Sequence, residues 1–151
     1  GSIPELEDAD LKALLERVTD YIAHRTSDKV KISTHVPDSL PPVRLNVALF
    51  EWVIENLCKN AVDAMGGVGV LVISVQETSR YWCIDVADTG KGIDKRYFEM
   101  VFAPGYTTKK RGWGLGLSLA RRIVVEYHSG SIFVKQSEIN KGTIFRIELK
   151  K

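Results

Sequence analysis

The sequence predicts an α+β two-layer sandwich, in which a mixed sheet of about five strands carries three helices on one face. Apolar residues recur at helical spacing in three segments and alternate with polar residues in about five shorter ones. Two pairs of consecutive strands are separated by short polar stretches, which indicates hairpins and a mostly antiparallel sheet. Helices gathered on one face of such a sheet give two layers.

The N-terminal part of the chain predicts one helix and two extended pieces. Residues 6–24 carry apolar side chains at helical spacing, and Asp8 or Asp10 is the expected N-cap. Residues 30–36 alternate and predict a half-buried strand. A proline-rich loop follows, with a short extended piece at 43–45.

The second helix is expected to begin after Asn46, its N-cap, and to end at Gly66. Its apolar residues form one stripe. Asn56, Asn60 and Asp63 follow one another at spacings of four and three on the other face, so their side chains project side by side. Asparagine is a mediocre helix former, and two of them in mid-helix are a local cost that requires a reason.

The second half of the chain predicts two hairpins and a third helix. Residues 69–76 and 81–86 form the first hairpin, and residues 131–136 and 143–149 form the second. Residues 117–127 form an amphipathic helix between them.

Composition indicates one ordinary globular domain. The chain has 151 residues, 44% hydrophobic and 26% charged. Its net charge of +2 is too small to indicate a nucleic-acid partner, and no apolar run reaches membrane-spanning length. Cys58 and Cys83 lie in apolar patterns and are expected to be buried free thiols, as in the reducing cytoplasm. Residues 1–2 resemble an expression scar left by a protease, so the chain is expected to be a piece of a longer protein.

Two glycine clusters bracket the long segment between the first hairpin and the third helix. In Asp88-x-Gly90-x-Gly92, the carboxylate could accept a hydrogen bond from an exocyclic amine such as that of adenine, and the glycines let the backbone approach a purine. A plain turn explains the same three residues, and taken alone it is the better explanation.

The second cluster, Gly112-x-Gly114-x-Gly116, opens the third helix. Backbone N–H groups at a helix N-terminus bind phosphate, although a flexible loop before a helix explains the pattern equally well. The spacing fits neither a dinucleotide fingerprint nor a P-loop. The basic run 109–111 could neutralise a triphosphate, but a solvated charge run is the commoner meaning of such a cluster.

The asparagines of the second helix are candidate ligands of a cation. Mg²⁺ prefers oxygen ligands and shares them with substrate phosphates, so Asn56 or Asn60 could bind it. The alternative is a helix face bonded to neighbouring loops. His24, His35 and His128 are scattered, and their spacing indicates neither a metal site nor a catalytic triad.

The order of these motifs resembles the N, G1, F and G2 boxes of the catalytic, ATP-binding domain of bacterial sensor histidine kinases. These domains belong to the GHKL group, which shares the Bergerat fold. Residues 55–64 resemble the N box, and Gly142-Thr143 resembles the small motif that closes the adenine pocket. The resemblance covers nearly the whole chain, with residues 3–151 as a single catalytic domain excised from a longer kinase.

The resemblance implies a role for each matching residue. Asp88 would accept from the adenine N6 amine, with Thr143 close by. Asn60 would bind Mg²⁺, and Asn56 would assist at the phosphates. The implied catalytic residues are Asn56, Asn60 and Lys109. The implied nucleotide-binding residues are Asn56, Asn60, Asp63, Asp88, Gly90, Gly92, Ile93, Phe102, Tyr106, Thr107, Thr108, Lys109, Gly112, Gly114, Leu115, Gly116 and Thr143.

Within that set, Phe102 would anchor the lid and Lys109 would face the γ-phosphate. Residues 106–109 resemble the "TTK" lid of nitrogen- and oxygen-sensing-type kinases. Trp113 departs from the Thr or Ser usual at its place. Asn56 stands where the ATPase and serine-directed branches of the fold carry a glutamate base, and this departure favours a histidine acceptor.

The implied reaction transfers the γ-phosphoryl group of ATP, with Mg²⁺, to a histidine on a separate helical dimerisation domain of the same kinase. A response regulator would be an indirect partner. The fragment is expected to be monomeric and the full-length kinase a homodimer, which could be anchored in the inner membrane. The alternatives are a GHKL-type ATPase or serine-directed, anti-sigma-like kinase, and a degenerate nucleotide-binding interaction module.

Overall fold

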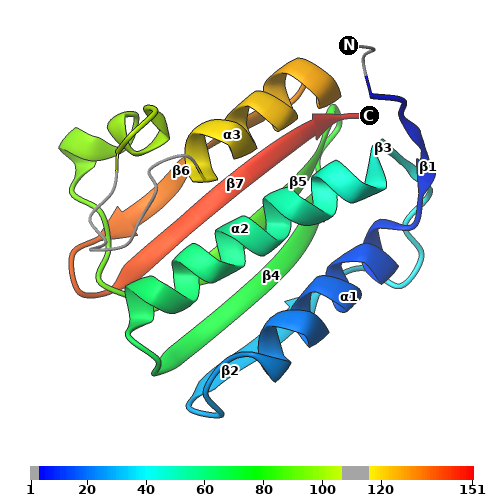
Figure 1. Ribbon diagram of the computed structural model, residues 1–151. Helices are drawn as coiled ribbons and strands as arrows, with labels where there is room; N and C mark the ends of the chain where they lie inside the picture. Colours follow the sequence, from blue (N-terminus) through cyan, green and yellow to red (C-terminus); the bar gives the residue numbers. More distant parts are fainter. Residues whose placement is uncertain (1–3, 107–115) are drawn as a thin grey trace.

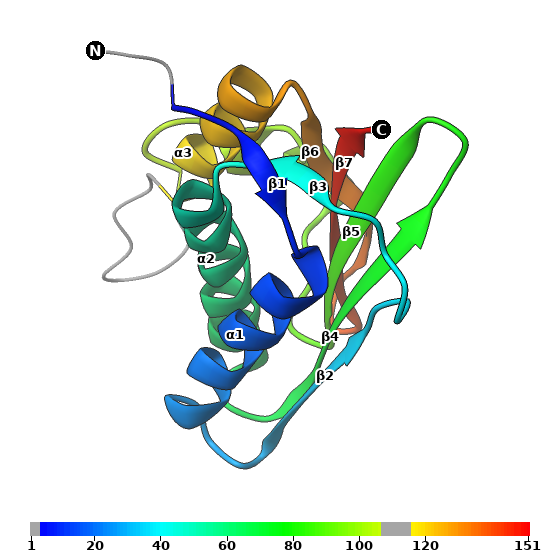
Figure 2. The same cartoon turned by 90° about the vertical axis from the view of Figure 1, so that its right-hand side faces the viewer.

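A computed structural model of the chain describes residues 4–106 and 116–151 (Figure 1). Within these ranges a five-stranded sheet carries its helices on one face, as the edge-on view in Figure 2 shows. The predicted two-layer fold class is confirmed. The helices are α1 (Leu11–His24), α2 (Val47–Met65) and α3 (Gly116–Arg122), and the strands are β1 (Glu7–Ala9), β2 (Val30–His35), β3 (Val43–Leu45), β4 (Gly69–Glu77), β5 (Tyr81–Asp88), β6 (Ser131–Glu138) and β7 (Gly142–Lys150).

The strand order is β2-β4-β5-β7-β6, with β5 at the centre. β2 and β4 are parallel, and α2 supplies the crossover that parallel neighbours require. The remaining pairs are antiparallel, and β4–β5 and β6–β7 are the two predicted hairpins. The central strand therefore has hydrogen-bonded neighbours on both sides.

The first helix begins at Leu11, and the prediction that it begins at Leu6 is wrong. Residues 7–9 instead form β1, which pairs antiparallel with β3 in a small second sheet. Asp10 is the N-cap: its backbone is extended, and its carboxylate accepts from the N–H of Ala13 at 3.0 Å. Because the N-cap residue is extended, the helix does not reach the residues before it, and these residues pair with β3.

The second helix has the predicted ends. The side chain of Asn46 accepts from the N–H of Leu49 at 3.1 Å, and Gly66 ends the helix with a left-handed φ of 65°. The apolar stripe is buried against the sheet, with Phe50, Val53 and Ile54 fully buried. This packing fixes the rotation of α2, so its polar face points away from the core.

The last helix changes its winding before it ends. α3 continues into a π-helical turn, η3 (Ile123–Tyr127), whose end is held by His128. The ring Nδ1 of His128 donates to the carbonyl of Ile123 at 3.1 Å, and its Nε2 accepts from the N–H of Asn46 at 3.1 Å. One buried imidazole thus joins the end of η3 to the start of α2.

The face of the sheet away from the helices carries polar side chains. Asp85 of β5 is only 6% exposed there, because Arg146 and Lys135 cover it. Arg146 donates two hydrogen bonds to its carboxylate, at 2.7 and 2.9 Å. Cys58 and Cys83 are buried free thiols, as predicted. Among the described residues, no helix is both long and apolar enough to span a membrane.

Candidate functional site

Asp88 is the last residue of the central strand β5 and is 8% exposed. Its Oδ1 accepts from the N–H of Gly90 at 2.8 Å. Burial raises the pKa of Asp88 above its ordinary value of 3.8, while hydrogen bonds from the backbone of Gly90 and Thr143 oppose that shift. Asp88 is therefore a carboxylate that is costly to bury. It lies at the end of a strand, where its remaining oxygen lone pairs can accept hydrogen bonds from a ligand.

Thr143 lies directly opposite Asp88 in the β5–β7 ladder and is 4% exposed. The structure thus brings together the two residues predicted to recognise a base. Gly142, just before Thr143, has a φ of 125°, and a Cβ there would overlap the carbonyl oxygen of Asp88. Only glycine lets β7 approach the end of β5 this closely.

The loop after Asp88 is held between the end of α2 and the β6–β7 hairpin. A Cβ on Gly90 would lie 2.7 Å from the carbonyl carbon and oxygen of Ala64, and the N–H of Lys91 donates to that oxygen at 2.9 Å. Gly92 has a φ of 77°, and a Cβ there would overlap the carbonyl oxygen of Glu138. Both glycines are therefore required by close contacts within the protein itself.

Asn56 projects from the polar face of α2 toward the start of α3. A Cβ on Gly116 would lie 2.7 Å from both the Nδ2 and the Oδ1 of Asn56, so the helix and the amide are in direct contact. The Nδ2 atom is buried and has no hydrogen-bond partner among the residues that the structure describes. A buried amide donor without a partner is costly, and a ligand oxygen would relieve that cost.

Asn60 and Asp63 share the polar face of α2 with Asn56. Asn60 is half-buried and Asp63 is exposed. No group of three or more His, Cys, Asp and Glu side chains in the described ranges is placed to hold a metal ion. The magnesium ligand expected at Asn60 is an amide oxygen, which such a group does not include, and it stays a prediction.

Phe102 lies in the short helical turn η2 (Met100–Phe102) and is 4% exposed. Its ring meets Phe145 of β7 edge-on, with centroids 6.0 Å apart. The guanidinium of Arg121 lies 4.2 Å above the Phe102 ring and also pairs with Glu99 at 3.1 Å. Arg121 of α3 thus ties η2 to the helix that follows residue 115.

The remaining predicted residues divide into two groups. Ile93 packs against the core, and the ring of Tyr106 lies 6.4 Å from that of Tyr97. Several others lie outside the described residues, so their predicted roles stay predictions: Thr107, Thr108, Lys109, Gly112, Trp113, Gly114 and Leu115.

Two residues at the site were not predicted. Ser137 accepts from the N–H of Ile93 at 2.7 Å and lies 2.7 Å from the hydroxyl of Thr143. Arg121 holds Phe102, as described above. Arg121 stands beside Arg122 within the predicted third helix, and this basic pair is the signal that could have suggested it. The strand pattern places Ser137 on the wrong face.

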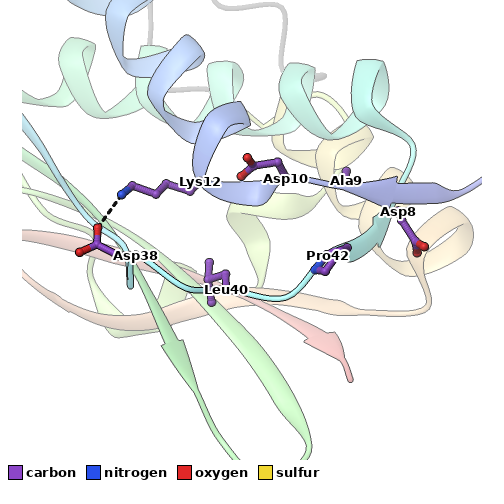
Figure 3. A pocket seen from close by; sticks show the side chains of 7 residues that line it. All are labelled: Asp8, Ala9, Asp10, Lys12, Asp38, Leu40 and Pro42. Carbon is purple, nitrogen blue, oxygen red and sulfur yellow. Dashed lines mark hydrogen bonds and ion pairs between the residues drawn. The ribbon is translucent and has the colours of Figure 1, made fainter.

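A separate cavity of about 260 Å³ lies between β1, the start of α1 and the loop before β3 (Figure 3). Asp8, Asp10 and Asp38 line it, together with Lys12. Each of these carboxylates already has a partner: Asp38 pairs with Lys12 at 2.7 Å, Asp10 caps α1, and Asp8 pairs with Arg44 at 3.6 Å. This cavity does not indicate a ligand.

Comparison with known proteins places the chain in a family. The profile of the histidine kinase-, DNA gyrase B- and HSP90-like ATPases matches residues 46–151, and the chain belongs to this family. The chain is 32% identical over 145 residues to the sensor histidine kinase ZraS of Escherichia coli K12, covering 95% of this chain and 31% of ZraS. Sporulation kinase C of Bacillus subtilis is 37% identical over 97 residues, which are 64% of this chain and 22% of that kinase. The chain thus spans about a third of the length of ZraS and a smaller share of the length of sporulation kinase C.

Solved structures agree with this placement. The catalytic domain of the histidine kinase ThkA superposes with a TM-score of 0.83 at 26% identity, covering 97% of this chain and 96% of that domain. The full-length histidine kinase ShkA, solved with AMPPNP, has the same fold, with a TM-score of 0.84 at 24% identity over 95% of this chain and 30% of that one. The fold is therefore that of histidine kinase catalytic domains, and ATP binding follows from membership in the family of histidine kinase-, DNA gyrase B- and HSP90-like ATPases.

Proposed function

We propose that this domain binds Mg-ATP and donates the γ-phosphoryl group to a histidine on a separate dimerisation and phosphotransfer domain, in two-component signal transduction. The observation that carries the proposal is the buried carboxylate of Asp88, set beside Thr143 at the end of the central strand. Removing this charge from water is unfavourable, and a hydrogen bond donated by a ligand amine would offset that cost.

The base would be recognised at Asp88. One carboxylate oxygen is already bonded to the N–H of Gly90, which fixes the orientation of the group. An exocyclic amine at position 6 of a purine would donate to the carboxylate, whereas a 6-oxo group would place an acceptor against it. The chemistry of the site therefore favours adenine over hypoxanthine or guanine.

The phosphates would lie at the polar face of α2. The buried Nδ2 of Asn56 supports this, because a phosphate oxygen is the acceptor that it lacks among the described residues. Asn60 would hold Mg²⁺ through its amide oxygen, and the ion when bound would neutralise charge on the phosphates. Lys109, predicted to face the γ-phosphate, lies outside the described residues. Catalysis would be mainly positioning and electrostatic stabilisation.

The phosphoryl acceptor would come from another domain. His128 is buried, and both of its ring nitrogens are hydrogen-bonded, to Asn46 and Ile123. The Nδ1 of His24 is bonded to the carbonyl of Asp20 at 2.7 Å. The contacts therefore leave His128 no free ring nitrogen, whereas His24 and His35 are exposed. The feature that favours a histidine acceptor is the asparagine at position 56, where other branches of the fold carry a glutamate.

The partners of the parent protein are proposals of the same kind. We propose that residues 3–151 act within a longer, homodimeric kinase that passes its phosphoryl group to a response regulator, and that the isolated domain is monomeric. The "TTK" lid subtype also remains a prediction, since it depends on residues 107–109.

Calorimetric titration with Mg·ADP tests the nucleotide site. The parent chain is expected to bind, and Asp88→Asn is expected to lose most of the affinity while remaining folded, because an amide oxygen can still accept from Gly90. Equal binding by both proteins would contradict the placement of the base at Asp88.

Labelled ATP tests the reaction. The chain alone is expected to stay unlabelled, and acid-labile label is expected on an added histidine-bearing helical domain. Acid-labile label on the chain alone, or acid-stable label on the partner, would contradict the proposal.

A further inference from the structure

We infer that Ser137 is a positioning residue that fixes the direction of the Thr143 hydroxyl and thereby makes the site select 6-amino over 6-oxo purine nucleotides. The inference rests on the proposed function, because it assumes that a purine lies against Asp88 and Thr143. It concerns a residue that does not itself need to touch the nucleotide.

A β-bulge brings Ser137 to the site. Along β6, Ile132 and Val134 face the helices and pair with Ile147 and Phe145. The register then shifts between Val134 and Gln136, so that Ser137 pairs with Thr143. Without the extra residue, strand alternation would turn Ser137 to the opposite face of the sheet. Bulges are known to re-aim side chains next to functional sites.

The hydroxyl of Ser137 has its hydrogen-bonding capacity filled on three sides. It accepts from the N–H of Ile93 at 2.7 Å, and it lies 3.0 Å from the carbonyl oxygen of Gly142, to which it can only donate. Ser137 has a single hydroxyl proton, which it uses in the hydrogen bond to the carbonyl oxygen of Gly142. The 2.7 Å contact with Thr143 must then use the proton of Thr143.

This assignment decides what Thr143 presents to a ligand. Its hydroxyl proton points at Ser137, so only oxygen lone pairs are left for the pocket. Asp88 is an acceptor as well, and the two together form an acceptor pair at the end of β5 and β7. Such a pair suits a 6-amino group, or a water that donates to both Thr143 and the adenine N1. A 6-oxo group would meet acceptors only.

The test compares the affinities of Mg·ADP and Mg·IDP, which differ at position 6 and at N1 of the base. Ser137→Ala frees the Thr143 hydroxyl to rotate and to donate to a 6-oxo group. The ratio of ADP to IDP affinity is expected to fall about 3- to 10-fold, the contribution of one hydrogen bond. Ser137→Thr keeps the hydroxyl and is expected to retain the ratio.

Ser131→Ala is the matched control. Ser131 lies on the same strand, but its hydroxyl contacts Glu148 at 3.4 Å, so the substitution is expected to leave the ratio unchanged. In a Thr143→Val background, Ser137→Ala is also expected to leave the ratio unchanged, because no hydroxyl is left to rotate.

Two outcomes would overturn the inference, and they differ. If the parent binds ADP and Ser137→Ala weakens both nucleotides by the same factor, Ser137 is only structural, while the proposed function stands. If the parent binds neither nucleotide, the proposed function fails and the inference falls with it.

Discussion

The side-chain amide of Asn56 lies directly against the Cα of Gly116, with no space for a Cβ between α2 and the start of α3. Asn56 is only half-buried, so its amide can be displaced. The contact therefore sets the position of a predicted phosphate-binding group without being essential to the core.

Gly116→Ala is expected to lower the affinity for Mg·ADP about 10-fold, because the new methyl group displaces the Asn56 amide. Stability is expected to change by less than about 1 kcal/mol, since alanine also favours the helix that begins at this residue. Titration calorimetry and urea denaturation measure the two quantities. In an Asn56→Ser background, Gly116→Ala should have no further effect on affinity, and an undiminished affinity in the single variant would contradict the prediction.

Asp88→Asn is expected to make the nucleotide-free protein more stable at neutral pH. The pKa of Asp88 is raised by burial, so the native state holds the proton more tightly than the unfolded chain does. Stability therefore falls as pH rises through this raised value, and Asn removes that loss. Urea midpoints from about pH 4 to about pH 7 measure the effect, which should grow with pH. A variant less stable than the parent at neutral pH would contradict it.

His128 is expected to destabilise the fold in mild acid. Burial lowers the pKa of His128, so below its unfolded value of about 6.5 the unfolded chain binds more protons than the native one. The contribution of neutral His128 to the stability of the fold is therefore complete above that pH. It is lost as pH falls through the lowered pKa of the folded state. Protonation would also remove the acceptor for the N–H of Asn46.

Thermal unfolding against pH checks this expectation. His128→Gln is expected to flatten the dependence and to cost about 1–3 kcal/mol through lost packing against Phe50, whose ring lies 5.5 Å from the imidazole. His24→Gln is the control, because His24 is exposed. An unchanged slope in His128→Gln would show that other groups set the acid sensitivity.

Arg121→Gln is expected to cost about 0.5–1 kcal/mol, because it removes a cation above the Phe102 ring and an ion pair with Glu99. Arg122→Gln is the matched control: the ion pair between Arg122 and Glu126 is exposed and is expected to contribute less. Urea unfolding compares the two variants. Equal losses would mean that the contact with Phe102 is energetically unimportant.

The parts of the fold that could be predicted are those determined by residues close together in the sequence. α2 is the clearest case, since Asn46 caps it and Gly66 ends it, and both roles depend on neighbouring residues only. Asp88 and Thr143 could be assigned to one site because the family resemblance supplied the pairing. Their register in the β5–β7 ladder confirms that they lie together.

The parts that could not be predicted depend on distant partners. Residues 7–9 have no strand pattern of their own, and they are extended because β3 offers a pairing edge. Ser137 was missed because the bulge that re-aims it is invisible in strand alternation. The π-helical turn depends on how the chain after α3 meets the start of α2, through His128 and Asn46.

The central position of β5 has a consequence for the timescale on which the site can open. Amides of strand residues that are paired on both sides exchange with solvent only in large, rare unfolding events, whereas the first turn of a helix and edge elements exchange through local fluctuations. Asp88 belongs to the slow class, and Gly116, at the first turn of α3, belongs to the fast one. A bound nucleotide would therefore slow deuterium uptake in α3 far more than in β5. The base would stay bound at Asp88 during local opening of the first turn of α3.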